Sequence, residues 1–253
     1  MLMLMILYFA VSLVGIAFCF RVFTAWGNRW GASPAECSAR MTGDAYLEGG
    51  PPARVIMTRA VSISKPPEVV WPWLAQLGRG AGWYSFEYLD NGGKTSARHI
   101  VSWVPEPQLG DASPIGYLRH LDPGREIVWW AGGCNFLGVT ARMMIDIAVR
   151  PEGEGSRLVI RISGDAAGPS AQLALWVFQV IDTIMARRQL LGIKERVERY
   201  GCRIDDSDHP ENGAREQYQF YEVIYASGER AGVRGKEGAA NWRQHAKEDK
   251  VLV

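Results

Sequence analysis

The chain has 253 residues, of which 47% are hydrophobic and 22% charged, and its formal net charge is +1. Such a chain buries one core of ordinary domain size and leaves roughly 100 residues for appendages. The near-neutral balance gives no field that would attract nucleic acid, and no basic helix is interleaved with stacking aromatics. Nucleic-acid binding is therefore not expected.

The four cysteines are spread along the chain without a CxxC pair, and no histidine stands at metal-ligand spacing from them. They are Cys19, Cys37, Cys134 and Cys202. The sequence thus predicts neither a disulfide framework nor a metal site, and no motif indicates a cofactor.

The first twenty residues, MLMLMILYFAVSLVGIAFCF, contain no charged side chain. At 1.5 Å per residue an α-helix of this length reaches about 30 Å, the thickness of the bilayer hydrocarbon. A cleaved secretory signal peptide would have a basic start and a shorter apolar run that ends in small residues, and this segment has neither. We therefore expect residues 1–22 to form a retained transmembrane anchor.

Positive charge follows this segment, at Arg21, Arg29 and Arg40, whereas only the α-amine precedes it. The positive-inside rule then places the rest of the chain in the cytoplasm, as in a single-pass protein of the cell membrane. Trp26 and Trp30 fall just beyond the span, where indole side chains tend to lie at the headgroup level.

Residues 23–53 predict a juxtamembrane linker, because most of this stretch is rich in Gly, Pro, Ala and Ser and lacks an apolar period. Alternation over 54–64 predicts a half-buried strand. Pro66, Pro67 and Glu68 then form a helix entrance, and apolar residues at helical spacing continue to Gly78, with Pro72 expected to loosen the helix. A short second helix is expected over 82–91.

The next part of the chain reads as antiparallel strands followed by one long helix. Strands are predicted over 99–104, 115–121, 126–131, 140–150 and 157–163. The run from 171 to 200 contains no Gly or Pro before Gly192 and carries many apolar residues, so it predicts a helix with a wide apolar face. The order is one strand, two short helices, several strands and a long closing helix.

These elements resemble the SRPBCC superfamily, which includes START-like lipid carriers, the birch-pollen-allergen fold and polyketide cyclases/dehydrases. The resemblance covers residues 54–201 and is carried by TRAVSISKPPEVVWPWLAQLGRGAGWYSFEYLDN, by SARHIVSWVPEPQLGD and by the final hairpin and helix. In particular, PPEVVWPWL followed by GWYS is similar to a bacterial subgroup often labelled polyketide cyclase/dehydrase. The resemblance implies an α+β helix-grip fold, in which a curved antiparallel sheet wraps around the long C-terminal helix.

The same resemblance implies an apolar cavity between the sheet and the long helix. The residues expected to line it are aromatic or aliphatic and come from the inward strand positions, the helix face and a gate segment. They are Trp83, Tyr84, Trp103, Tyr117, Trp129, Met143, Ile145, Ile160, Trp176, Val180 and Ile184. We therefore expect binding or carriage of a small hydrophobic ligand, such as a lipid or a polyketide-like compound.

Catalysis has few candidate residues. The glycines of LGRGAG follow a helix and are spaced as GxGxG, which is typical of a turn and not of a phosphate loop. Serine-nucleophile motifs and paired carboxylates are absent from the sequence. His99 and His120 are weak candidates for a general base.

Two alternatives remain open. In the first, His99, His120 or Tyr84 enolises a polyketide-like substrate in a cyclase or dehydratase; an inward-facing histidine with a carboxylate partner would favour it. In the second, a membrane-tethered domain with a closed core recruits protein partners. Ligand identity, catalysis and oligomeric state are not determined by the sequence.

Residues 202–253 form a polar C-terminal extension with charges of both signs. Tyr218, Tyr221, Ile224 and Tyr225 recur at helical spacing within it. This pattern predicts one amphipathic helix that packs back on the domain.

Overall fold

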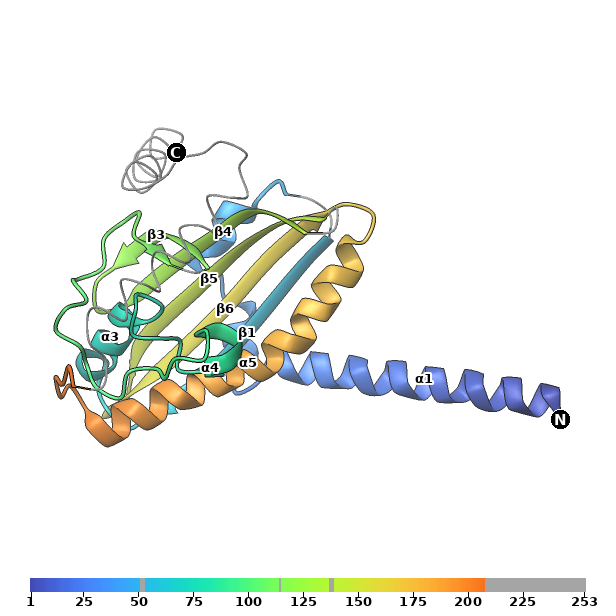
Figure 1. Cartoon of the computed structure of the whole chain (residues 1–253), viewed down its shortest axis with the longest axis horizontal. Coiled ribbons are helices and arrows are strands. Elements are labelled where there is room, and N and C mark those ends of the chain that lie inside the picture. The colour runs from blue at the N-terminus through green and yellow to red at the C-terminus, as the bar shows by residue number, and fades with distance from the viewer. Residues whose placement is uncertain (51–52, 114, 137–138, 208–253) are drawn as a thin grey trace.

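The computed structural model describes residues 1–50, 53–113, 115–136 and 139–207 (Figure 1). The helix predicted around Tyr218 to Tyr225 lies outside the described residues. The helices are α1 (Leu2–Gly27), α2 (Pro34–Ser38), the 3₁₀ helix η1 (Thr42–Leu47), α3 (Pro67–Gln76), α4 (Glu87–Asp90) and α5 (Ala171–Tyr200). The strands are β1 (Ala53–Ile63), β2 (Ala112–Ser113), β3 (Gly116–Asp122), β4 (Glu126–Phe136), β5 (Val139–Glu152) and β6 (Gly155–Ala167).

The six strands form one antiparallel sheet in the order β1-β6-β5-β4-β3-β2. Alternation divides their side chains between two faces. The inner face carries residues such as Met57, Ile147 and Ile160, which share one core with α3 and α5. The outer face carries residues such as Met144 and Val159, which pack against η1 and the residue before it. Figure 1 shows α5 running across the sheet, which is the helix-grip arrangement of an α+β fold.

Helix α5 closes the inner face with a row of residues at helical spacing. Leu175, Ala186, Leu190, Ile193 and Val197 are buried on this side. Position 192 of this helix requires glycine, because a Cβ there would lie 2.1 Å from the carbonyl oxygen of Tyr84. The 30-residue helix ends at Gly201, whose φ of 58° suits glycine.

Helix α1 projects away from the domain (Figure 1). The stretch Met3–Gly27 contains an 18-residue window with a mean hydropathy of 2.5, none of which is buried, and the helix is long and apolar enough to cross a membrane. The predicted apolar N-terminal helix is present, and it continues five residues beyond the predicted end of the span, to Gly27.

The chain that leaves α1 covers the free edge of β1. The backbone N–H of Thr58 donates to the carbonyl of Asn28 at 2.8 Å, and that of Ala60 donates to the carbonyl of Trp30 at 3.2 Å. Because an uncovered edge strand would present unpaired polar groups, these bonds finish the sheet as well as attach α1 to it. Trp30 was expected at the membrane interface, and it is half-buried against the domain core with the Arg187 guanidinium over its ring.

The end of α1 crosses α5 closely at Gly27. A Cβ at this position would lie 2.1 Å from the Thr183 side chain. The adjacent Asn28 amide donates to the Gln179 side chain at 2.7 Å. These contacts fix the direction in which α1 leaves the domain.

Replacing Gly27 with Leu is expected to lower the free energy of unfolding by about 1–3 kcal/mol, because the added side chain must force α1 away from Thr183. Chemical denaturation of the full chain in detergent measures this loss. Gly15→Leu is the matched control, since a Cβ at Gly15 meets nothing within 4 Å. Equal stability of the two variants would contradict the close crossing.

Two predicted elements differ from the structure. Only Glu87–Asp90 of the helix expected over 82–91 is helical. The strand expected over 99–104 is absent, and Ile100 makes a single isolated bridge to Ile204. The Gln76 amide explains this, because it donates to the carbonyl of His99 at 3.2 Å and accepts from the N–H of Val101 at 3.0 Å. A side chain thus replaces the neighbouring strand.

The stretch expected to be a juxtamembrane linker is ordered and docked on the outer face. Its residues 33–47, which we call the outer segment, contain α2 and η1. Arg161 of β6 is buried and donates to the Asp44 carboxylate at 2.7 Å and to the Ala39 carbonyl at 2.6 Å. Arg157 also contacts the outer segment, through Glu36 at 2.8 Å. The buried Arg161 and the half-buried Arg157 thus hold a segment for which hydropathy predicts no regular structure.

A buried carboxyl group lies under the same segment. Asp146 of β5 is fully buried, and its Oδ1 accepts from the backbone N–H of Gly43 at 2.9 Å. Burial raises the pKa of Asp146 to about 7; the Gly43 hydrogen bond opposes the rise, and the nearby Glu126 and Asp44 carboxylates add to it. In the unfolded chain the same carboxyl group would have a pKa of about 3.9. The folded state therefore holds an extra proton between these two pH values.

Because the folded state binds the extra proton, stability should fall as pH rises from about 4 toward 7. Asp146→Asn removes this dependence, so the variant should gain stability relative to the wild type between pH ~5 and ~8, by up to about 1.4 kcal/mol per pH unit. Urea denaturation at the two pH values measures the gain. A difference in unfolding free energy that stays constant with pH would contradict the role of Asp146.

Candidate functional site

The inner face is sealed at one end. Ile63, Ile147, Val149 and Leu158 are at most 2% exposed there. They share the core with residues of α3 and of the second half of α5, namely Trp73, Leu74, Leu190, Ile193 and Val197. Side chains packed this completely leave no room for a ligand.

The opposite end of the inner face is only partly covered. Ala141, Met143 and Ile145 of β5 point to the inner face but are half-buried. Ala174 and Phe178, from the first half of α5, are likewise half-buried and pack against the same core. This half-open end lies near the crossing of α1 and α5, and it offers apolar surface that neither layer fully covers. We refer to it as the open end.

Charge is scarce on the inner face. Among its described strand residues, Arg59 is the one charged side chain, and it donates to the Asp182 carboxylate of α5 at 2.5 Å. Its Nε also donates to the carbonyl of Gly27 at 2.6 Å. Burial raises the pKa of Asp182, while the Arg59 guanidinium opposes the rise. The two charged groups thus engage each other, and Arg59 also joins them to the end of α1.

The predicted cavity residues of the sheet divide between the two ends. Trp129 and Ile160 are buried within the inner-face core. Met143 and Ile145 lie at the open end and are half-buried. Cross-strand pairing of Trp129 with Ile145 brings an aromatic and an aliphatic side chain together on this face.

Trp83 and Tyr84 belong to the core and not to a mobile gate. The Trp83 ring lies against Gly78, where a Cβ would approach it to 2.3 Å. The Gln76 amide donates to the Tyr84 hydroxyl at 2.6 Å, and the Arg196 guanidinium lies 4.8 Å from the Tyr84 ring centroid. Burial raises the pKa of Tyr84, so its hydroxyl remains neutral and is a poor general base. The LGRGAG stretch is a turn, as expected, closed by the N–H of Gly78 and the carbonyl of Gly82.

Two predicted cavity residues lie elsewhere. Tyr117 pairs directly with Trp130, which packs with η1 on the outer face, so Tyr117 belongs to that face as well. The bulge in the middle of β3 prevented a correct assignment of its faces from alternation. Trp103 lies in a separate small cluster with Ala81, Ala97 and Val101, because the strand expected around it does not form.

The helix residues expected at the cavity are turned away from the sheet. Ile184 is 52% exposed, and Trp176 is 38% exposed beside Phe20 of α1. Val180, which lies between these two residues in the sequence, is half-buried. The first half of α5 is apolar on all sides, so hydropathy alone cannot decide which side faces the sheet. Ala174 and Phe178 take the inward role that the sequence assigned to Trp176 and Ile184.

Neither candidate histidine reaches the open end. His99 is buried near the end of α5, where its ring packs edge-on against Tyr200 and its Nδ1 lies 4.0 Å from the Asp205 carboxylate. His120 pairs with Val128, an outer-face residue. Among the described residues no cluster of three His, Cys, Asp or Glu side chains is suited to a metal ion.

Sequence reasoning missed the Arg59–Asp182 pair and Phe178. One signal was present, because Arg59 falls on the same parity as the inward residues Val55 and Met57. A charged residue on an apolar parity indicates a buried partner. The identity of the partner depended on the rotation of α5 and could not be read from the sequence.

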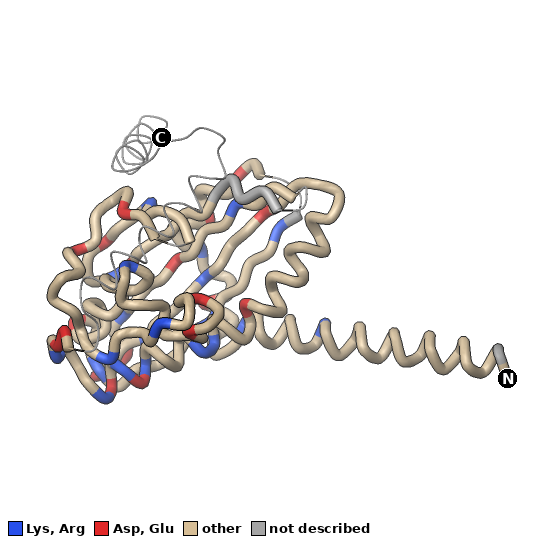
Figure 2. Tube along the Cα trace, in the orientation of Figure 1, with Lys and Arg blue, Asp and Glu red and all other residues tan. Residues whose placement is uncertain are grey.

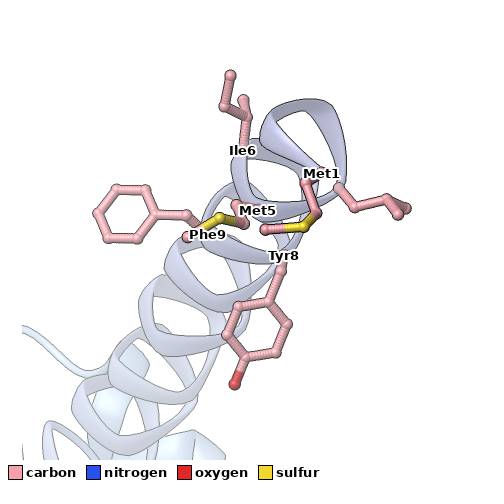
Figure 3. Close-up of a pocket in the computed structure, with 6 residues that line it drawn as sticks. Met1, Met5, Ile6, Tyr8 and Phe9 are labelled. Carbon is pink, nitrogen blue, oxygen red and sulfur yellow. The ribbon is translucent and has the colours of Figure 1, made fainter.

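A shallow apolar hollow also lies at the tip of α1, far from the domain (Figure 3). It is lined by Met1, Leu4, Met5, Ile6, Tyr8 and Phe9 of this single helix. Exposed side chains that splay from one helix within the expected membrane span do not form a ligand site.

No protein-family model matches the sequence, and no curated protein matches it either. Solved structures with a similar chain course include a protein from Mesorhizobium loti, with 15% identity, a TM-score of 0.36 and coverage of 58% of this chain and 98% of that one. An AHSA1-like protein from Rhizobium etli has 14% identity, a TM-score of 0.33 and coverage of 62% and 89%.

The di-domain ARO/CYC BexL from the BE-7585A biosynthetic pathway has 18% identity and a TM-score of 0.37, and the match covers 61% of this chain and 53% of that one. The chain therefore spans about half the length of that protein. Likenesses of this size carry no argument about activity.

The class of protein follows from the observed architecture itself. A six-stranded antiparallel sheet grips one long C-terminal helix, and an exposed apolar helix precedes them. The chain is an α+β protein of the helix-grip, START-like type. The expected α+β helix-grip fold is thereby confirmed.

Proposed function

We propose that the protein binds or carries a small hydrophobic molecule, a lipid or a polyketide-like compound, at the open end of the inner face. Helix α1 anchors it in the cell membrane, with the domain on the cytoplasmic side. The supporting observation is the contrast between the two ends of one apolar face. One end is packed so completely that it leaves no room for a ligand, and the other leaves Met143 and Ile145 half-buried.

Physical chemistry favours binding of this kind. Each Å² of apolar surface that leaves water contributes about 25 cal/mol, so a ligand of fatty-acid size gains several kcal/mol without any polar contact. The chemistry that an enzyme would need lacks support, because Arg59 and Asp182 neutralise each other and the two candidate histidines lie away from this end.

The membrane part of the proposal is supported by the sequence around the end of α1. The exposed Arg21 lies near the end of α1 and the exposed Arg29 just beyond it, and no charged side chain precedes Arg21 in the helix. Basic residues at this position favour the cytoplasmic side. A ligand taken from the bilayer would have a short path to the open end, because α1 and the first half of α5 pack together beside it.

Ile145→Trp is expected to abolish ligand retention, because the larger ring would occupy the open end. Native mass spectrometry of the full chain in mild detergent, after loading with a long-chain fatty acid, measures the ligand-bound fraction. The wild type should retain the ligand. Ile56→Trp is the matched control, since Ile56 is 46% exposed on the outer parity of β1 and should leave retention unchanged.

Stability gives an independent readout of the same variant. If the open end holds space, Ile145→Trp should lower the free energy of unfolding by less than about 1 kcal/mol, whereas a filled core would be overpacked at a loss of about 1–3 kcal/mol. A destabilised Ile145→Trp together with a wild type that retains no ligand would overturn the proposal in favour of a closed interaction domain.

A further inference from the structure

The first half of α5 carries an apolar stripe on its solvent side. The stripe consists of Leu173, Trp176, Val177, Ile181 and Ile184, whose side chains are between 38% and 61% exposed. Their spacing of three, four, eight and eleven residues from Leu173 keeps them on one side of the helix. A soluble domain normally places polar residues on such a side. Apart from the contact of Trp176 with Phe20, the described part of the chain leaves this stripe uncovered.

Charge is distributed unevenly along the same helix. From Ala171 to Ile181 no residue is charged, and Asp182 is paired with Arg59. The exposed Arg187 and Arg188 begin the charged second half. Figure 2 shows the Lys, Arg, Asp and Glu positions gathered toward the C-terminal end of α5, while its first half and α1 are almost entirely tan, the colour of uncharged residues.

The position of the stripe relative to α1 is fixed by two contacts. Phe20 packs edge-on against Trp176 with 5.5 Å between ring centroids, and Gly27 lies against Thr183. The two helices thus run in the same direction along this contact. Phe20 is the last residue before Arg21, the first charged side chain of the sequence. Trp176 is therefore level with the end of the uncharged span.

We infer that this stripe is a membrane-contact surface, which lies in the headgroup region of the same bilayer that α1 enters. The inference rests on the anchoring role proposed for α1. An indole level with the end of the span, aliphatic side chains beside it and arginines behind it are the pattern of an interfacial helix. Figure 1 shows that the first half of α5 lies at the end of the domain from which α1 leaves.

The bilayer fits this surface better than a second copy of the chain does. A helix inserted in the membrane holds the stripe next to lipid continuously, so contact requires no encounter between proteins. The exposed Arg21 and Arg29 add attraction to anionic headgroups. The consequence for the proposed function is that the first half of α5 lies between the bilayer surface and the open end, so that one helix separates the ligand site from lipid.

The test uses the full chain without its native cysteines, reconstituted in vesicles of three parts phosphatidylcholine to one part phosphatidylglycerol. Val177→Cys carries an environment-sensitive fluorophore, and the vesicles contain spin-labelled lipid as a quencher. The label should shift to the blue and lose most of its emission. Glu195→Cys, exposed on the second half of α5, is the matched control and should retain its emission. Val14→Cys reports insertion of α1.

The other outcomes overturn the inference. A shielded label at 177 that lipid does not quench means that protein covers the stripe: a second copy if shielding is lost on dilution into more lipid, residues 208–253 if it is not. Equal exposure at 177 and 195 with a quenched label at 14 means that α1 inserts while the stripe faces water. An unquenched label at 14 refutes the anchor itself, whereas ligand retention by the Ile145→Trp series tests the binding proposal separately.

A charge variant completes the test. Val177→Glu combined with Ile181→Glu should remove the quenching of a label at Leu173→Cys by spin-labelled lipid, because carboxylates disfavour the apolar interface. Both positions are solvent-exposed in the structure, so the domain should remain folded by circular dichroism. Undiminished quenching in this variant would contradict a contact made by the stripe.

Discussion

Replacing Arg59 with Met is expected to produce the largest loss of stability of any single change at the junction of α1, β1 and α5. The side chain is 1% exposed, and it holds the Asp182 carboxylate and the Gly27 carbonyl at once. Removing it leaves a carboxylate buried without a counter-charge, which costs about 3–5 kcal/mol. Guanidinium denaturation of the full chain in detergent, followed by tryptophan fluorescence, measures the loss.

Two controls separate the buried pair from charge in general. Arg59→Met combined with Asp182→Leu removes both charges and should recover most of the lost stability. Arg40→Met breaks a pair with Glu48 in which both side chains are more than 60% exposed, at 68% and 62%, and should change stability by less than about 1 kcal/mol. An Arg59→Met variant as stable as Arg40→Met would refute the account of this junction.

Replacing Arg161 with Met is expected to release the outer segment from the sheet. Arg161 is 2% exposed and donates to three backbone carbonyls of this segment, those of Glu36, Cys37 and Ala39, as well as to the Asp44 carboxylate. Without these bonds buried acceptors lose their donor, and a loss of about 3–5 kcal/mol is expected. Hydrogen exchange should accelerate in residues 33–47 before it does in β5 and β6.

The control for this change is Arg150→Met, an exposed arginine on the adjacent strand β5. It should leave both the stability and the exchange of the outer segment unchanged. Uniform acceleration of exchange across the sheet in Arg161→Met would mean that the arginine supports the whole domain and not this segment in particular.

The strands and the long helix were predictable because their patterns are long. Alternation over 140–150 and 157–163 predicted the hairpin of β5 and β6. An uninterrupted apolar run predicted α5. In each case many residues agree on one period, so local exceptions carry little weight.

The outer segment and the loop around His99 were not predictable in this way. Polar side chains decide both, namely Arg161 and Gln76, which bond to backbone groups remote in the sequence. A hydropathy pattern contains no information about which carbonyl a buried side chain will meet. Hydropathy therefore predicted a linker where the outer segment lies and a strand where the loop around His99 lies.

The candidate site was predictable on the sheet and not on the helix. The alternation of β5 placed Met143 and Ile145 on the inner face, as the structure has them. For α5 the apolar residues surround the helix, so its rotation depends on the polar partners of Asp182 and Thr183. These partners turn Ile184 outward, and because apolar periodicity does not register them, the sequence wrongly assigned Ile184 to the cavity.

The central claim is that an apolar ligand binds between the inner face and α5 at the open end. Photo-crosslinking of the full chain in lipid nanodiscs with a diazirine-bearing fatty acid, followed by peptide mapping, tests it most directly. The account predicts adducts on β5 around Met143 and Ile145 and on α5 around Phe178. Adducts confined to α1, with none on β5 even at saturating probe, would contradict it.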